Sequence, residues 1–251
     1  MDKQKALELF KNKEYAKAID EFSSVLEHDE NDLEVLNTMG LAYYYMNDFE
    51  NAEKYFVKVL KLNPAQTEAY INLADVYYKQ KLYAEATDLL QIGVRENPEN
   101  TVLKHYLARV YMEDTQLDLA IDELDAILEK EPDNYDAYYD LGRVYFELGN
   151  YASAIECFEN ILEYKEDNAW VYYFLGEAYE ANDEIDKALS NFLKATAVNN
   201  SFPLPYKKAA ILYMARGENE DAIEFFEDYL NLGVPKEEEQ QVKSLIARLK
   251  K

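Results

Sequence analysis

The chain has 251 residues, of which 49% are hydrophobic and 14% aromatic, and this composition is sufficient for a folded core. It carries 50 acidic and 26 basic side chains, a formal net charge of −24, which repels the phosphate backbone of nucleic acids and anionic membrane surfaces. We therefore expect neither a nucleic acid nor a membrane as partner. The excess charge is interpreted first as a solvated outer face, and second as a means of attracting a basic partner.

Apolar runs are only a few residues long, so no segment is expected to cross a bilayer. Residues 1–15 carry charges where a signal peptide needs its apolar segment, and we expect a cytoplasmic protein unless a leader preceded this sequence. Cys157 is the only cysteine, so the fold cannot depend on an intramolecular disulfide.

A period of 34 residues runs from the first residue to Lys236 without insertion or deletion. One column is alanine in every copy: Ala18, Ala52, Ala86, Ala120, Ala154, Ala188 and Ala222. A second is tyrosine in all copies but the first: Tyr43, Tyr77, Tyr111, Tyr145, Tyr179 and Tyr213, with Leu9 in the first. A third holds large apolar residues: Phe22, Phe56, Leu90, Leu124, Phe158, Phe192 and Phe226. The sequence therefore predicts seven repeats, over residues 1–32, 33–66, 67–100, 101–134, 135–168, 169–202 and 203–236.

Each repeat is predicted to contain a first helix, a short turn and a second helix. In the fifth repeat, an apolar face with helical spacing runs from Tyr138 to Tyr145. Gly149 interrupts this periodicity, and a second apolar face runs from Tyr151 to Leu162. Two such helices joined by a short turn form an antiparallel pair.

Small residues recur on the first helix of each repeat, and we expect them to let the two helices approach closely: Ala6, Gly40, Ala74, Ala108, Gly142, Gly176 and Ala210. Pro64, Pro98 and Pro132 follow second helices and end them. Because one repeat cannot bury both of its faces, neighbouring repeats are expected to stack into a solenoid.

The segment at about residues 236–251 is predicted to be a helix, because Val242, Ile246 and Leu249 share one helical face. We expect this helix to cap the last exposed apolar face of the array. The alternative is that it binds a partner, and both roles are compatible.

One repeat carries the residues of a known pattern: Tyr138-x-x-Leu141-Gly142-x-x-Tyr145, then Tyr151-x-x-Ala154-x-x-x-Phe158. This pattern resembles the tetratricopeptide repeat, and the resemblance covers essentially the whole chain. It implies an all-α fold, a right-handed α-solenoid (superhelix) of seven helix-turn-helix repeats plus a capping helix, in a single domain over residues 1–251. The final proline of the family pattern is replaced at Glu30, Glu166, Asn200 and Val234, which leaves the expected fold unchanged.

The resemblance also implies a non-catalytic scaffold or adaptor that binds a protein or peptide in a concave groove lined by the first helices. Carried over position by position, the expected groove residues are Tyr44, Asn72, Tyr78, His105, Tyr106, Arg109, Tyr139, Arg143, Phe146, Trp170, Tyr173, Phe174, Lys207 and Lys208. Arg109 and Arg143 hold the same position in adjacent repeats, and a guanidinium suits a carboxylate ligand. The alternative for these arginines is an ion pair with Asp136 or Asp140 within the groove wall.

Trp170, Tyr173 and Phe174, with Tyr139, form an expected aromatic cluster, and aromatic residues and arginine are enriched at interface anchors. We therefore expect a partner segment with an aromatic or aliphatic anchor and a carboxylate near it. Two alternatives remain open: self-assembly of the chain into an oligomer, and a role as docking subunit of a larger enzyme or secretion complex.

Catalytic constellations are not evident in the sequence. His28 and His105 occupy different positions in their repeats, Cys157 has no histidine close in sequence, and every glycine is isolated. We therefore expect no enzymatic activity, no bound metal and no cofactor.

Overall fold

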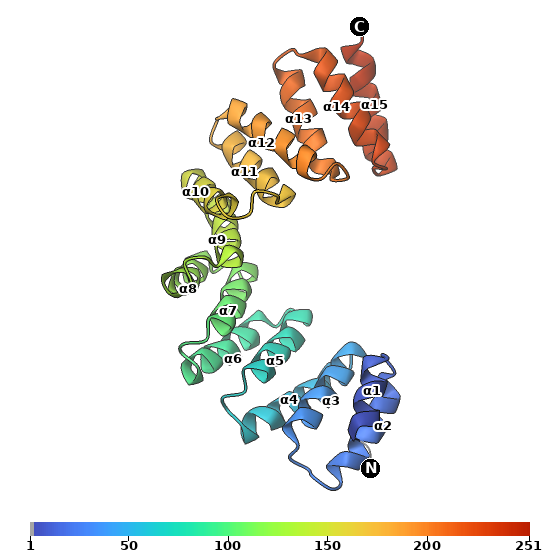
Figure 1. Ribbon diagram of the computed structural model, residues 1–251, viewed down its shortest axis with the longest axis vertical. Coiled ribbons are helices and arrows are strands. Elements are labelled where there is room, and N and C mark those ends of the chain that lie inside the picture. The colour runs from blue at the N-terminus through green and yellow to red at the C-terminus, as the bar shows by residue number, and fades with distance from the viewer. Residues whose placement is uncertain (1–2) are drawn as a thin grey trace. The chain divides into compact units, whose positions relative to one another are not determined.

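The computed structural model describes residues 3–251, so residues 1 and 2 of the first expected repeat lie outside the described part. The described residues form fifteen helices and no strand, which confirms the all-α fold (Figure 1). The helices are α1 (Lys3–Lys11), α2 (Tyr15–Leu26), α3 (Leu33–Tyr45), α4 (Phe49–Leu62), α5 (Thr67–Lys79), α6 (Tyr83–Glu96), α7 (Thr101–Glu113), α8 (Leu117–Lys130), α9 (Tyr135–Glu147), α10 (Tyr151–Leu162), α11 (Ala169–Ala181), α12 (Ile185–Val198), α13 (Pro203–Ala215), α14 (Asn219–Asn231) and α15 (Lys236–Leu249).

The chain divides into two compact units, each described by itself. The N-terminal unit, Met1–Lys130, contains α1 to α8, and the C-terminal unit, Glu131–Lys251, contains α9 to α15. Odd-numbered helices up to α13 are the first helices of the repeats, and each packs against the second helix that follows it (Figure 1). Inside each unit, a second helix also packs against the first helix of the next repeat, so the repeats stack as expected.

The repeating columns form the core. The alanine of every repeat is fully buried, and Phe22, Phe56, Phe158, Phe192 and Phe226 are at most 1% exposed. A Cβ atom on Gly142 would lie 2.8 Å from Cε1 of Phe158, and the corresponding distance from Gly40 to Phe56 is 2.5 Å. The close approach of the two helices at these small residues is thus confirmed.

Glycine and alanine are distributed in this column according to the size of the facing side chain. In the central repeats glycine occurs with phenylalanine, as in Gly142 and Phe158, whereas alanine occurs with leucine, as in Ala108 and Leu124. The first and last repeats combine alanine with phenylalanine instead. Interior packing is dense enough for a single methyl group to matter, so the two columns complement each other in volume.

The turn between the two helices has the same backbone geometry in all seven repeats. One residue per turn has a positive φ: Lys13, Asn47, Lys81, Thr115, Gly149, Asp183 and Gly217. Only two of these are glycine, although the left-handed region is unfavourable for other residues, and most of all for a β-branched one such as Thr115 with φ 58°. The turn geometry is therefore imposed by the packing of the two helices and not by the local residue alone.

Helix α15 packs against α14 and covers the end of the C-terminal unit. Val242 and Ile246 are 4% and 8% exposed and belong to a cluster with Ala210, Phe226 and Tyr229. The capping role predicted from the sequence is confirmed by this packing.

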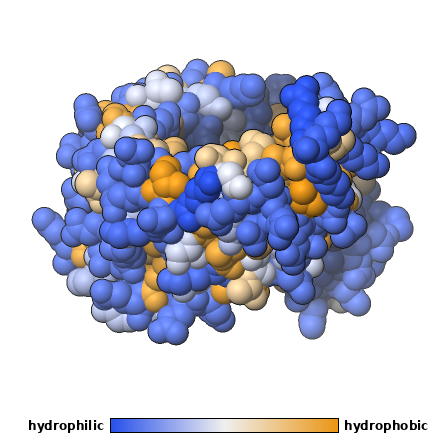
Figure 2. Space-filling view, turned by 90° about the horizontal axis from the view of Figure 1, so that it is seen from above, coloured by the Kyte–Doolittle hydropathy of each residue, from blue (hydrophilic) through white to orange (hydrophobic). Residues whose placement is uncertain are grey.

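None of the described helices is long and apolar enough to cross a membrane. In the view of Figure 2, hydrophilic side chains cover most of the surface and hydrophobic side chains appear in separate patches. This agrees with a charged fraction of 30% in the sequence.

Candidate binding site on the first helices

The expected groove residues all lie on first helices and fall into two sets, one in each unit. Those of the N-terminal unit lie on α3, α5 and α7: Tyr44, Asn72, Tyr78, His105, Tyr106 and Arg109. Those of the C-terminal unit lie on α9, α11 and α13: Tyr139, Arg143, Phe146, Trp170, Tyr173, Phe174, Lys207 and Lys208. Each set forms its own local environment.

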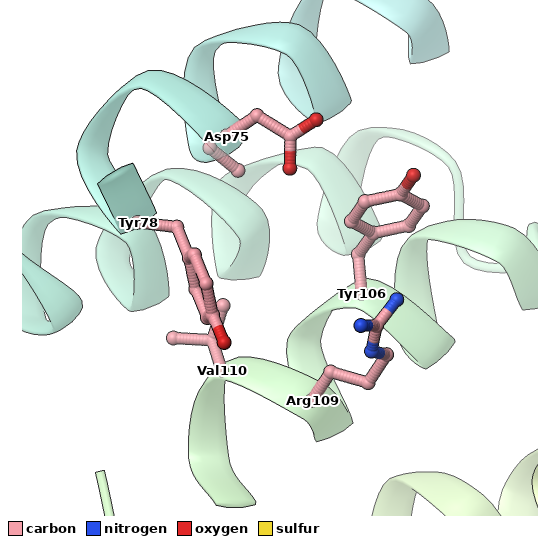
Figure 3. Close-up of a pocket in the computed structure, with 6 residues that line it drawn as sticks. Asp75, Tyr78, Tyr106, Arg109 and Val110 are labelled. Carbon is pink, nitrogen blue, oxygen red and sulfur yellow. The ribbon is translucent and has the colours of Figure 1, made fainter. Parts of the chain in front are cut away.

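In the N-terminal unit, a pocket of about 50 Å³ opens between α5 and α7, which pack directly against each other. Figure 3 shows Asp75 and Tyr78 on one helix and Tyr106, Arg109 and Val110 on the other, with their side chains around a common space. The pocket therefore combines an acceptor, a cation and two phenol groups over an apolar floor.

Burial and neighbouring positive charges have opposite effects on the acidic group of this pocket. Burial raises the pKa of the Asp75 carboxyl, and the positive charges of Arg109 and Lys79 only partly offset this effect. Burial, followed by the negative charge of Asp75, also raises the pKa of Tyr44 of α3, although Tyr44 does not line the pocket. Within residues 3–251, no acidic side chain lies within ion-pair distance of Arg109.

Other predicted residues of this unit are engaged within the protein. The Asn72 side chain donates a hydrogen bond to Asn37 Oδ1 at 3.1 Å, which links α5 to α3. Burial, followed by the interaction with the Glu113 carboxylate of α7, raises the pKa of Tyr78. Both interactions join first helices of adjacent repeats.

In the C-terminal unit, four aromatic side chains form a continuous series, here called the aromatic shelf: Tyr139, Phe174, Trp170 and Phe202. The ring centroids of Tyr139 and Phe174 are 5.6 Å apart, those of Phe174 and Trp170 are 6.0 Å apart, and those of Trp170 and Phe202 are 4.3 Å apart. Trp170 is 50% exposed, and Phe174 and Tyr139 are half-buried. An apolar surface on this scale is the kind at which a partner side chain can anchor.

Tyr173 is more deeply buried than its neighbours Trp170 and Phe174. It is only 8% exposed and its ring packs on Phe192 and Phe202, with centroid distances of 5.8 Å and 5.4 Å. Its side chain therefore supports the shelf from beneath and offers little surface of its own. Phe146 is half-buried and packs against Tyr151 at 5.4 Å.

Arg143 stands at the end of the shelf. Its guanidinium lies 5.8 Å from the centre of the Tyr139 ring, and Nη1 lies 3.4 Å from Oδ1 of Asp140. The ion pair with Asp140 that was the alternative interpretation is thus present. At 3.4 Å it is long for a charge-assisted hydrogen bond, and the Arg143 side chain remains 47% exposed. Asp140 is the one hydrogen-bond partner of this guanidinium among the described residues.

The two lysines of α13 are already paired. Lys208 Nζ lies 2.8 Å from Glu177 and 3.0 Å from Glu180, and although burial would lower the pKa of Lys208, these two hydrogen bonds raise it overall. Lys207 Nζ lies 2.7 Å from Glu238 of the capping helix. Both ammonium groups therefore stabilise the C-terminal unit before any partner arrives.

Phe202 supports Trp170 within the shelf but is only 6% exposed, and the periodic columns did not select it because it lies just before α13 in the last position of its repeat. An aromatic residue directly before a helix was the available signal. Among the described residues, no group of three or more His, Cys, Asp or Glu side chains is arranged to hold a metal ion.

Comparison with known proteins agrees with the helical pattern. A family model described as tetratricopeptide repeat (TPR) matches residues 37–101 and 139–202, and a second model with the same description matches residues 83–141 and 111–165. A DnaJ protein P58IPK homolog of Arabidopsis thaliana is 41% identical over 68 residues, which are 26% of this chain and 14% of that protein. The chain thus matches only a small part of the length of this relative.

Solved structures show the same fold. The C-terminal part of a TPR repeat-containing protein from Cytophaga hutchinsonii has a TM-score of 0.78 at 19% identity, over 94% of this chain and 97% of the other. YrrB, described as a TPR protein with an unusual peptide-binding site, has a TM-score of 0.60 at 22% identity, over 78% of this chain and 97% of YrrB. Proteins with this fold generally mediate protein–protein interaction and are generally non-catalytic scaffolds. Because the first family model alone matches half of the chain, this protein belongs to the tetratricopeptide repeat family.

Proposed function

We propose that this protein is a non-catalytic interaction module that binds a protein or peptide segment across the first helices of its C-terminal unit. The observation that carries the proposal is the aromatic shelf with half-exposed Trp170 on it and Arg143 at its end. Tryptophan, tyrosine and arginine are the residues most enriched at the energetic centres of interfaces.

The shelf is preformed, which favours binding. Trp170 rests on Phe174 and Phe202, so a partner does not have to order this side chain before it can pack there. An aliphatic or aromatic side chain of the partner would bury the exposed face of Trp170. The guanidinium of Arg143 would receive a carboxylate of the same segment, since its planar fork matches a carboxylate.

The spacing along the shelf limits the length of the recognised segment. The route from Arg143 to Trp170 passes over Tyr139 and Phe174, with steps of 5.8, 5.6 and 6.0 Å. An extended chain advances roughly 3.3–3.6 Å per residue, so roughly five residues separate the carboxylate from the anchor. The peptide-binding site named for YrrB is consistent with such use of the fold.

Selection from a displayed library of random peptides against the whole chain tests this proposal. We expect the selected peptides to share an aromatic or aliphatic residue and an Asp or Glu within about five residues of it. Trp170→Ala should weaken a selected peptide by at least about tenfold, as expected for an interface anchor. Arg143→Glu should weaken acidic peptides and leave variants with an amide in place of the acid less affected.

Two substitutions serve as matched controls. Tyr164→Ala removes another aromatic residue that is 67% exposed, and Arg95→Glu reverses an exposed arginine of the N-terminal unit. Neither should alter the affinity. If Trp170→Ala and Arg143→Glu both bind the selected peptides with unchanged affinity, the aromatic shelf is not the binding site. A mass that rises with concentration in light scattering, and that Trp170→Ala abolishes, would identify the partner as a second copy of the chain.

A further inference from the structure

The pocket between α5 and α7 is separate from the aromatic shelf and has a different chemistry. We propose that it binds a primary carboxamide, the side-chain group of glutamine or asparagine, held between the carboxylate of Asp75 and the guanidinium of Arg109. The proposal rests on the proposed function only in that the carboxamide would arrive as part of a bound segment.

The first observation is that the two charged groups face one pocket from neighbouring helices without pairing. Asp75 lies on α5 and Arg109 on α7, and both line the space that Figure 3 shows. Arg109 influences the charge of Asp75, yet within residues 3–251 neither side chain has an ion-pair or hydrogen-bond partner in the protein. The pocket thus offers an unused acceptor and unused donors on opposite sides.

The second observation concerns the burial of Asp75. Its carboxylate is half-buried, and burial raises its pKa despite the nearby positive charge. A partly desolvated acceptor gains from a donor more than an exposed one does, because its hydrogen bonds to water have already been reduced. The ligand group should therefore bring an N–H to Asp75.

The third observation is the size of the pocket and its charge balance. A volume of about 50 Å³ admits a group of a few atoms and excludes a whole peptide segment. A carboxylate would satisfy Arg109 but would lie against Asp75, and an ammonium would satisfy Asp75 but would lie against Arg109. A primary carboxamide is neutral, carries two donors and an acceptor in one plane, and can serve both residues at once.

Free small molecules test the pocket directly. The whole chain, labelled with ¹⁵N, is titrated with propionamide, propionate, propylammonium and N-methylacetamide, and the backbone amide signals are followed by NMR. We expect propionamide to shift signals of residues 74–78 and 106–110 with a dissociation constant in the millimolar range, as is typical of so small a ligand. Propionate and propylammonium should bind at least about tenfold more weakly, since each carries a repelled charge. N-methylacetamide, which represents the backbone peptide group, should also bind more weakly because it has a single N–H.

Substitutions locate the binding. Asp75→Ala and Arg109→Met should each abolish the shifts caused by propionamide, while Arg95→Met, an exposed arginine on α6, should leave them unchanged. The circular dichroism spectrum and unfolding midpoint of each variant establish that it is folded. If Asp75→Ala does not fold, the comparison of the four ligands on the unaltered chain decides the question.

Three results would overturn the proposal: shifts largest with propionate, which would mark an anion site; equal binding of N-methylacetamide, which would mark recognition of backbone; and no shifts with propionamide. These results are independent of the peptide selection. Propionamide binding without any selected peptide would reject the proposed function alone, and peptide binding through the shelf without propionamide binding would reject only the pocket.

Discussion

Replacing Gly142 by alanine is expected to destabilise the C-terminal unit, although alanine is the better helix former. An alanine in a helix interior is favoured over glycine by roughly 0.8–1 kcal/mol. Against this, the added Cβ would lie 2.8 Å from Cε1 and 2.9 Å from Cζ of Phe158. Phe158 is 1% exposed and its ring also contacts Tyr139 and Phe174, so it has little space into which to move.

The magnitude follows from the balance of these two effects. Overpacking of a well-packed core typically costs about 1–3 kcal/mol, and the gain in helix propensity offsets roughly 1 kcal/mol of it. We therefore expect a net loss of about 1 kcal/mol in the free energy of unfolding. The sign is the informative part, because helix propensity alone predicts a gain of similar size.

The chain itself suggests the compensating substitution. Where the first helix carries alanine in the central repeats, as at Ala74 and Ala108, the facing residue is leucine, at Leu90 and Leu124. Phe158→Leu alone should lose roughly 1 kcal/mol because it leaves a cavity opposite a glycine. In the double variant the alanine methyl occupies part of that cavity, and we expect a favourable coupling of about 1–2 kcal/mol.

Trp170 is the only tryptophan and lies in the C-terminal unit, so its fluorescence reports the unfolding of this unit. Equilibrium urea denaturation of the unaltered chain, both single variants and the double variant gives the coupling energy. Ser190→Ala on exposed α12 surface serves as a control and should change stability by only a few tenths of a kcal/mol in the favourable direction. A gain of stability in Gly142→Ala, or a coupling energy of zero, would refute the steric argument.

Three further predictions concern the turns, the buried phenols and the paired lysine. Thr115→Gly should stabilise the N-terminal unit by about 0.5–1 kcal/mol, because it relieves a β-branched residue at φ 58°; thermal unfolding followed by circular dichroism measures this, and a loss of stability would contradict it. Burial, followed by the hydrogen bond to Glu53, raises the pKa of Tyr77 to about 12. Folding therefore favours the neutral phenol, and its contribution to the free energy of unfolding is complete below about pH 10 and is lost between about pH 10 and 12. Over this range the unfolding midpoint of Tyr77→Phe should fall less than that of the unaltered chain. Lys208→Met should destabilise the C-terminal unit by about 1 kcal/mol at neutral pH, because it leaves Glu177 and Glu180 without their shared cation. The loss of stability should shrink at acidic pH, where the two glutamates become protonated. An unchanged urea midpoint at neutral pH would show that the two ion pairs do not stabilise the unit.

Much of the fold follows from the sequence because the packing repeats with the period. The alanine column and the large apolar column both predicted buried positions, and both are buried. The turn geometry did not follow, because five of the seven left-handed positions hold residues other than glycine, such as Lys81 and Asp183. The division after Lys130 did not follow either, since the period continues through Glu131 without any change.

The binding surfaces were less predictable, because the same position can meet different neighbours. Arg109 and Arg143 share a position, but the residue three places earlier is Tyr106 in one repeat and Asp140 in the other. Only Arg143 therefore gains an ion pair within its own helix. Pairings between separate helices, such as that of Lys207 with Glu238, depend on how the capping helix packs and are not encoded in the spacing of either residue.

The position of Arg109 beside Asp75 in one pocket is informative, although a cation without an ion pair is not unusual in this chain. Lys207, Lys208 and Arg143 each have at least one carboxylate within 4 Å, whereas Arg95, like several other basic side chains of the described residues, has none. Arg109 has none among the described residues, although Asp75 lines the same pocket. An exposed pair of opposite charges gains too little from contact to overcome the entropy of holding two side chains together, so separation alone would be unremarkable at the surface. Asp75, however, is half-buried and has lost part of its hydration, which increases the benefit of a donor. A neutral ligand with both a donor and an acceptor can therefore hydrogen-bond to Asp75 and Arg109 at once. For this reason we expect the pocket to be more selective for its ligand than the aromatic shelf is.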